Sequence, residues 1–192
     1  VICDELSAPV LVLNLRASDD GPTSRALRLY ADAGEPTFLS IRQLLRTPLK
    51  FSREFVGSVV YVCENPSVVA AVANRLGNQS APLVCIEGQP RTATRLLLNS
   101  LQGAGVRLVY HGDFDWPGIQ IANTILSRHK AEPWRMGAND YRTSAVHSLA
   151  LSGLPVAATW DSNLMPAMHE LGLAIHEEQV TETLIADLAQ AY

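Results

Sequence analysis

From residue 58 onward the chain repeats one pattern: a short apolar run, a polar turn and an amphipathic helix. The apolar runs predict strands over residues 58–63, 82–86, 106–110 and 154–160. Strands that alternate with helices of ten or more residues form right-handed βαβ units around a mainly parallel sheet. The runs are almost continuously apolar, as is typical of strands buried on both faces. The sequence therefore predicts an α/β fold, with a mainly parallel sheet of about four strands and helices on both faces.

The first 57 residues are less regular. Their patterns predict strands at 9–15 and 37–40 and helices at 23–33 and 41–45. We expect an N-terminal α/β extension over residues 1–57, which packs on a core domain over residues 58–192. Because the chain begins with Val1 rather than Met, we expect it to be the C-terminal piece of a longer protein. The upstream region of that protein is then one expected partner, and other subunits are a second.

The composition narrows the class of protein. A formal net charge of −4 and a pI near 5.7 argue against nucleic-acid binding by bulk electrostatics, which needs a basic surface. The three cysteines, Cys3, Cys63 and Cys85, are odd in number and lack metal-ligand spacing. Such cysteines are typical of a reducing compartment, and we expect a cytoplasmic protein. No apolar run approaches the roughly 20 residues of a membrane span, so we expect no membrane partner.

Acidic residues follow each predicted strand of the core domain: Glu64, Glu87, Asp113 with Asp115, and Asp161. Ligands of parallel sheets bind at the carboxyl ends of the strands, so we expect these side chains to project from one edge. Asp113 and Asp115 are two residues apart, which puts them on one face of an extended segment, where their charges repel. Hard divalent ions such as Mg²⁺ bind one or two carboxylates together with substrate phosphates. The sequence therefore predicts a divalent-metal site at this edge.

Three motifs on these elements resemble the toprim domain. They are Glu64 at the end of the first core strand, the turn 87–90 (EGQP) followed by TATR at 92–95, and the turn 113–119 (DFDWPGI). Over residues 58–130 they are similar to the type IIB topoisomerase A subunit and its meiotic double-strand-break relatives. Most of the chain looks more similar still to an uncharacterised bacterial family with a C-terminal toprim-like domain. That family is related to the toprim nuclease subunit of the Wadjet anti-plasmid systems.

The resemblance implies an activity and a role for each acidic residue. Glu64 matches the toprim glutamate, a metal ligand or general acid/base, while Asp113 and Asp115 match the aspartates that hold Mg²⁺ or Mn²⁺. The implied function is metal-dependent endonuclease cleavage of DNA, in plasmid or phage defence, and Asp161 is a candidate to extend the metal site. Trp116 lengthens the aspartate turn by one residue relative to the topoisomerase version. No segment with a nucleophilic tyrosine can be identified, so we expect hydrolysis by water.

Substrate contacts are expected from two groups of residues. Gly88, Arg91 and Arg95 lie in and after the second turn of the core domain, beside the acidic edge. The most basic neighbourhood precedes the core domain and consists of Arg42, Arg46, Lys50 and Arg53. Because the carboxylates repel DNA, we expect weak, salt-sensitive cleavage by this chain alone and stronger cleavage with an upstream region or partner.

Two other functions are compatible with these residues. One is a toprim-like module that binds nucleic acid or a partner without cleaving it. The other is a phosphoryl-transfer enzyme acting on small molecules, although phosphatases of the haloacid-dehalogenase type need an aspartate pair after the first core strand, where this chain has only Glu64. Of the five histidines, His111 is the only one that we expect near the acidic edge, as a hydrogen-bonded turn residue. For Glu177 and Glu178 we expect a favourable interaction with the helix dipole and no chemistry.

Overall fold

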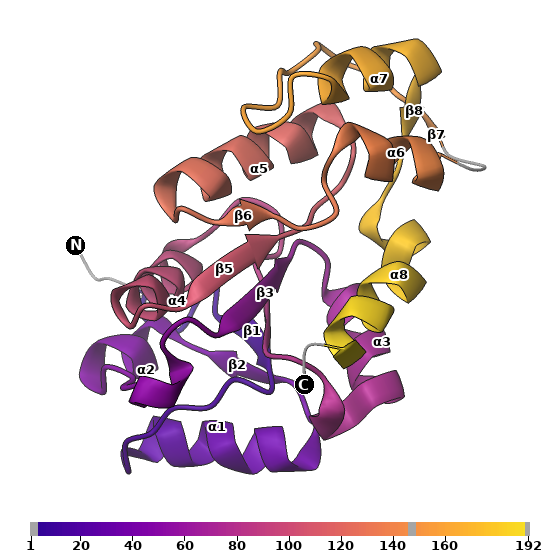
Figure 1. Ribbon diagram of the computed structural model, residues 1–192. Helices are drawn as coiled ribbons and strands as arrows, with labels where there is room; N and C mark the ends of the chain where they lie inside the picture. The colour runs from indigo at the N-terminus through magenta and orange to yellow at the C-terminus, as the bar shows by residue number, and fades with distance from the viewer. Residues whose placement is uncertain (1–3, 146–148, 191–192) are drawn as a thin grey trace.

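The structure, a computed structural model, describes residues 4–145 and 149–190. Its centre is a six-stranded sheet with the order β2-β1-β4-β3-β5-β6 (Figure 1). The strands are β1 (Val10–Leu13), β2 (Thr37–Leu39), β3 (Val59–Cys63), β4 (Leu83–Cys85), β5 (Arg107–Tyr110) and β6 (Glu132–Pro133). Strands β3 to β6 are parallel, while β1 is antiparallel to both β2 and β4. The predicted α/β class and mainly parallel sheet are confirmed.

Helices cover both faces of the sheet. They are α1 (Pro22–Ala33), α2 (Ile41–Arg46), α3 (Pro66–Leu76), α4 (Thr92–Gly103), α5 (Trp116–Arg128), α6 (Ala138–Ser144), α7 (Leu164–Leu171) and α8 (Glu177–Gln190), with 3-10 turns η1 (Arg53–Phe55) and η2 (Gly77–Gln79). The connections β3-α3-β4 and β4-α4-β5 cross the sheet in opposite directions, so right-handed crossovers put α3 on one face and α4 and α5 on the other. Helix α8 packs beside α3 (Figure 1).

Local sequence signals explain the helices that flank the candidate site. Helix α3 begins with Asn65, whose side chain accepts a hydrogen bond from the backbone N–H of Ser67, and with Pro66 at its first position. Helix α5 begins in the same way at Asp115, with Pro117 in its first turn. Strand β4 is fully buried, β3 is mostly and β5 half buried, and the short β6 is exposed. In both helices the cap and the proline are local sequence signals for a helix start.

The predicted strand over residues 154–160 is wrong. This segment forms no strand, and the side chain of Leu154 is 85% exposed. Pro155 has no backbone N–H to donate to a neighbouring strand, which disfavours a place inside a sheet. The fourth parallel strand is instead β6, which pairs with β5. Two short strands, β7 (Leu149–Ala150) and β8 (Leu173–Ala174), pair in a separate two-stranded sheet.

The N-terminal region contributes to the central sheet rather than only covering it. Strands β1 and β2 continue the sheet beyond β4, so the predicted boundary at residue 57 falls between strands of one sheet and stays a prediction. Cys63 and Cys85 are buried free thiols, and Cys3 lies outside the described residues. Within the described ranges, none of the helices has both the length and the apolar composition that would let it cross a membrane.

Candidate functional site

The candidate site lies at the carboxyl ends of two neighbouring strands, β3 and β5. The helix that follows β3 leaves toward one face of the sheet, and the helix that follows β5 leaves toward the other. Open α/β sheets bind ligands in the crevice that such diverging connections create. Glu64 is the first residue after β3, and Asp113 and Asp115 lie in the turn after β5. The fold therefore brings all three predicted acidic residues to this crevice.

The two aspartates are fixed by different contacts. Asp115 caps helix α5, because its Oδ1 accepts a hydrogen bond of 2.6 Å from the backbone N–H of Gly118. Asp113 Oδ1 accepts a hydrogen bond of 2.8 Å from the backbone N–H of Glu177, and its Oδ2 lies 3.1 Å from His176 Nδ1. Asp113, Asp115 and His176 each offer one ligand atom, and these atoms all lie within 4.8 Å of one another. Two carboxylates and an imidazole at this spacing could hold a divalent metal ion.

Glu64 lies beside this group in a half-buried position. The buried hydroxyl of Tyr110 donates a hydrogen bond of 3.3 Å to Glu64 Oε2. Burial, and after it the negative charge of Asp113, raise the pKa of Glu64 to about 7, although hydrogen bonds from the backbone of Asp113 and from Tyr110 act in the opposite direction. A carboxyl group with a pKa near neutrality can both take and release a proton at physiological pH. Glu64 thus has the chemistry of a general acid or base.

Two glycines let the backbone approach these carboxylates. A Cβ atom on Gly112 would lie 2.4 Å from the Tyr110 hydroxyl and 2.9 Å from Glu64 Oε2. A Cβ atom on Gly118 would lie 2.3 Å from the carbonyl oxygen of Asp113 and 3.0 Å from Asp115 Oδ1. At each glycine the shorter of the two distances leaves no room for a side chain unless neighbouring atoms move. The glycines are therefore part of the geometry of the site.

Glu177 links the two halves of the site, although we expected no chemistry for it. Its side chain is fully buried, and its carboxylate accepts hydrogen bonds from the backbone N–H groups of Glu64 (2.9 and 3.0 Å) and Asn65 (2.6 Å). Its own backbone N–H binds Asp113. Burial raises the pKa of Glu177 well above its ordinary value. One residue at the start of α8 thus fixes both the turn after β3 and the turn after β5.

The histidine prediction was half right. His111 is a buried turn residue whose Nδ1 lies 2.9 Å from the carbonyl oxygen of Trp134, as expected, and burial lowers its pKa to about 4. It is not the only histidine near the edge, because His176 contacts Asp113 directly. That hydrogen bond raises the pKa of His176. His147 lies outside the described residues.

Asp161 does not join the cluster of Asp113, Asp115 and His176 among the residues that the structure describes. Its Oδ2 accepts a hydrogen bond of 2.8 Å from the backbone N–H of Ala138, at the start of α6, and its Oδ1 accepts one of 2.9 Å from Asn163. The prediction for Asp161 required a strand over residues 154–160 that ends at the sheet edge. Because these residues form no strand, Asp161 does not follow a strand of the sheet. Its contacts make it a residue that joins the starts of α6 and α7.

The predicted substrate contacts divide into two groups. Gly88, Arg91 and Arg95 lie between β4 and the first turn of α4, so they share the edge of Glu64 one strand away. Gly88 has a φ of +78°, which favours glycine. The side chains of Arg91 and Arg95 are exposed. In sheet order they lie one strand from Glu64 and two strands from the turn that holds Asp113 and Asp115.

The four basic residues that precede the core domain do not all lie at the same edge of the sheet as Glu64. Arg42 lies in α2, which follows β2, three strand positions from β3, or roughly 14 Å at the usual strand spacing. Arg42 also pairs with Glu5 at 3.2 Å. Arg53 lies in η1, before the first residue of β3, and hence at the opposite edge from Glu64. Arg46 and Lys50 are exposed. These four residues do not form one surface beside the acidic site.

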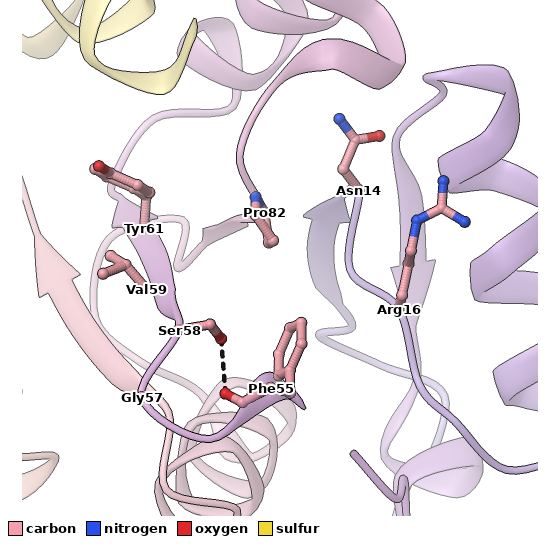
Figure 2. Close-up of a pocket in the computed structure, with 8 residues that line it drawn as sticks. All are labelled: Asn14, Arg16, Phe55, Gly57, Ser58, Val59, Tyr61 and Pro82. Atoms are coloured by element: carbon pink, nitrogen blue, oxygen red, sulfur yellow. Dashed lines mark hydrogen bonds between the residues drawn. The ribbon is translucent and has the colours of Figure 1, made fainter. Parts of the chain in front are cut away.

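A cavity of about 440 Å³ lies at that opposite edge (Figure 2). It is lined by Asn14, Arg16, Phe55, Gly57, Ser58, Val59, Tyr61 and Pro82. Figure 2 shows the Phe55 ring pointing into the space between Ser58 and Asn14, while the Arg16 guanidinium points away from it. Arg16 instead pairs with Asp32 at 2.6 Å. No lining residue carries a carboxylate, so this cavity lacks the acid/base groups found at the ends of β3 and β5.

Comparison with known proteins identifies a family. The sequence model of a family described as "protein of unknown function C-terminus (DUF2399)" matches residues 37–188. The match includes Glu64, Asp113, Asp115 and His176, and it crosses the domain boundary predicted at residue 57. A search of curated proteins finds no match.

Proposed function

We propose that this chain, which belongs to the family described as "protein of unknown function C-terminus", binds a divalent metal ion at the ends of β3 and β5 and hydrolyses phosphodiester bonds in DNA. One observation carries the proposal: Glu64, Asp113 and Asp115 meet, with His176, at the crevice where the helices after two neighbouring strands diverge. The resemblance to toprim nucleases supports the same reading, and it is the source of the proposed role in plasmid or phage defence.

The side chains fit a divalent ion. The ligand atoms of Asp113, Asp115 and His176 lie close enough to share one ion. Carboxylates suit Mg²⁺ and Mn²⁺, whereas an imidazole nitrogen suits transition metals, so the mixed set favours Mn²⁺ if His176 is a ligand. Bound there, the ion would polarise the phosphate and lower the pKa of a bound water. Because one oxygen of Asp115 caps α5, its other oxygen is the one available to the metal.

Glu64 is the proposed proton carrier. With its pKa near 7, it can take a proton from an attacking water or give one to the leaving oxygen. The hydrogen bond from Tyr110 orients one carboxylate oxygen, and the Glu64 backbone is fixed by the hydrogen bonds that its N–H donates to the Glu177 carboxylate. Arg91 and Arg95, one strand away, are the proposed contacts for DNA phosphates. They would offset the repulsion between DNA and the acidic edge.

A second candidate function, a binding module that does not cleave, is favoured by one observation. Both oxygens of Asp113 already have partners within the chain, His176 Nδ1 and the backbone N–H of Glu177. A carboxylate satisfied in this way can serve structure alone. In the nuclease, a divalent ion would displace the contact between Asp113 and His176, whereas in the binding module this contact would remain. The next two experiments, on stabilisation by metal and on DNA cleavage, separate the two candidates.

We expect Mn²⁺ or Mg²⁺ to stabilise the protein. An ion at a hundred times its dissociation constant adds about 2.7 kcal/mol to the free energy of unfolding, or about 5–11 °C in melting temperature. The double substitution Asp113→Asn with Asp115→Asn should abolish this shift while keeping the fold, because asparagine caps helices as well as aspartate does. Asp161→Asn is the matched control and should keep the full shift. An equal shift in the double variant would remove the site from consideration.

Cleavage itself is tested with supercoiled plasmid in low salt. We expect the protein to nick the plasmid with Mn²⁺, to lose activity with EDTA, and to lose it also in the Asp113→Asn, Asp115→Asn variant. Asp161→Asn again serves as the control that should remain active. If the double variant nicks as fast as the wild type, the cleavage arises elsewhere. If no form nicks DNA yet the wild type binds it, the binding module is the correct function.

A further inference from the structure

The helices on the two faces of the sheet carry different charges. Helices α4 and α5, which lie on one face, contain no aspartate or glutamate. Helix α8, which packs beside α3 on the other face, contains no lysine or arginine and four acidic residues, Glu177, Glu178, Glu182 and Asp187. In Figure 1, α4 lies to the left of β3, and α3 and α8 lie to its right. The acidic net charge of the chain therefore does not extend to the helices of the α4–α5 face.

Four cations, the basic cluster, gather where the start of α4 meets the end of α5. Arg91 and Arg95 lie at the start of α4, Arg128 and Lys130 lie at the end of α5, and all four side chains are exposed. Burial lowers the pKa of His129 most, and the positive charges of Arg128 and Arg95 lower it further, so both guanidinium groups lie near this imidazole. Among the described residues, seven other arginines pair with carboxylates, whereas no cation of the cluster does.

The stability of the helices does not explain this cluster. Arg128 and Lys130 lie at the C-terminal end of α5, where the helix dipole favours cations. Arg91 and Arg95 lie at the N-terminal end of α4, where the dipole disfavours them, and the first turn of α4 has no acidic residue. Like charges on neighbouring helices also repel one another. A bound polyanion would replace this repulsion by attraction.

Helix α5 connects the candidate metal site to the basic cluster. Asp115 caps its start and Arg128 is its last residue, and at 1.5 Å per residue the two ends are roughly 20 Å apart. Between them, Gln120, Thr124 and Ser127 are exposed or half-exposed, and spacings of four and three residues place them on one face of the helix. Such polar side chains commonly contact phosphate oxygens and sugars in protein–DNA complexes. A polar, uncharged surface thus leads from the acidic residues to the cations.

We propose that duplex DNA lies along α5, with its sugar–phosphate backbone on Arg128 and Lys130 at the end of the helix and its cleaved phosphate at the start. This inference rests on the proposed function, because it gives the path of the DNA that the metal site would cleave. At 3.4 Å per base pair, the length of α5 corresponds to roughly six base pairs. Contacts to phosphates carry no sequence information, so we expect binding that is independent of sequence.

The residues of α4 and α5 favour a duplex over two other polyanions. Sites for single strands add aromatic side chains on which the bases stack, but the one aromatic residue of these two helices, Trp116, is only 5% exposed. A helix that binds an anionic membrane surface inserts large apolar side chains. The exposed large apolar residues of the described chain all lie outside α4 and α5.

The test measures DNA binding in EDTA, so that it needs neither metal nor cleavage. The probe is a fluorescent duplex of roughly 20 base pairs, followed by anisotropy over a range of salt concentrations. The double variant Arg128→Gln with Lys130→Gln should bind at least about tenfold more weakly than the wild type at low salt. The slope of log K against log salt should fall by about 1.8, or about 0.9 for each lost phosphate contact.

The matched control removes the same charge from the other face. Arg25→Gln with Arg75→Gln changes exposed residues of α1 and α3, and it should bind within about twofold of the wild type, because an exposed pair such as Arg75 with Glu182 contributes little to stability.

A gain of binding excludes misfolding as the cause. Gln120→Lys adds a cation to the exposed face of α5, midway along the proposed path, and it should strengthen binding and raise the salt slope by about 0.9. Gln79→Lys adds the same charge at an exposed position in η2, after α3, and it should leave the slope unchanged.

Three results would overturn this inference. One is an equal loss of binding in the two arginine-containing double variants, which would show that only net charge matters. Another is wild-type binding that Arg128→Gln with Lys130→Gln does not weaken. The third is a wild type that binds vesicles containing anionic phospholipid but not the duplex. Selective loss of binding in a protein that never nicks DNA would retain the path and reject the nuclease, whereas nicking and binding that are both unchanged in Arg128→Gln with Lys130→Gln would retain the nuclease and reject the path.

Discussion

Replacing Glu64 by glutamine should slow DNA cleavage by about 10²- to 10⁴-fold, the usual contribution of a positioned general acid or base. Glutamine keeps the size of the side chain and one oxygen that can accept the Tyr110 hydrogen bond, but it cannot carry the proton. Rates of plasmid nicking at saturating Mn²⁺ measure the effect. The control is Glu182→Gln, an exposed residue on α8 that pairs with Arg75, and it should cleave at the wild-type rate.

The same variant should be more stable than the wild type at alkaline pH without metal. Because folding raises the pKa of Glu64 from 4.5 to about 7, the folded state binds more protons than the unfolded state between these values. Stability therefore falls as the pH rises through this window. At pH 8 the ionised carboxylate costs about 3 kcal/mol, or about 6–12 °C in melting temperature, which Glu64→Gln would recover. Below pH 4.5 the difference should vanish.

If the wild type and Glu64→Gln nick DNA at the same rate, Glu64 is not the proton carrier. A stability difference that does not change between pH 4.5 and 8 would show that ionisation of Glu64 is not its cause. A gain in stability together with a loss of rate is the pattern expected where a site holds a carboxyl group in an unfavourable environment for its chemistry.

The second large effect concerns Glu177. Glu177→Ala removes the acceptor for the backbone N–H groups of Glu64 and Asn65 and leaves a cavity at a fully buried position. We expect a loss of at least about 3 kcal/mol relative to Glu177→Gln, whose side-chain oxygen can still accept both bonds. Denaturant unfolding of the two variants at pH 8 gives this difference directly. Both variants lack the buried, ionisable carboxyl group, so comparing them with each other rather than with the wild type cancels the effect of its removal.

The two Glu177 variants should differ in DNA cleavage in the same direction as they differ in stability. Glu177→Gln should keep the positions of Glu64 and Asp113 and hence retain metal-dependent nicking, while Glu177→Ala should lose it. If both variants nick DNA equally well, Glu177 supports the fold but does not position the site. If the alanine variant is as stable as the glutamine variant, the hydrogen bonds to the turn after β3 contribute little.

Local signals made much of this fold predictable. Asn65 and Pro66 set the start of α3, and Asp115 with Pro117 sets the start of α5, through contacts within three residues of each cap. The alternation of strands and helices was enough to predict the parallel sheet and the edge that holds Glu64 and the two aspartates. By contrast, β6 has only two residues, one of them a proline. A segment this short shows no alternation of apolar and polar residues from which a strand could be predicted. The apolar segment 154–160 was mistaken for the strand whose place β6 takes.

His176 and Glu177 were missed because tertiary contacts bring them to the site. His176 is 63 residues from Asp113, and Glu177 is 113 residues from Glu64. A β-bridge between Phe114 and Ile175 brings the residues just before His176 beside the turn that holds Asp113 and Asp115. One signal was present: the apolar residues 173–175 are followed at once by polar residues that begin a helix, the same pattern that marked Glu64. Spacing rules for metal ligands could not use it, since they apply to residues close in sequence.

The metal site at the ends of β3 and β5 is tested most directly by anomalous diffraction from crystals soaked in Mn²⁺. We expect a peak between the carboxylates of Asp113 and Asp115, within coordination distance of at least one oxygen of each, and no such peak in the Asp113→Asn, Asp115→Asn variant. A contact from His176 Nδ1 to the same peak would identify the imidazole as a ligand. A map with no peak there, or with manganese only at Asp140 and Asp161, would contradict the proposed site.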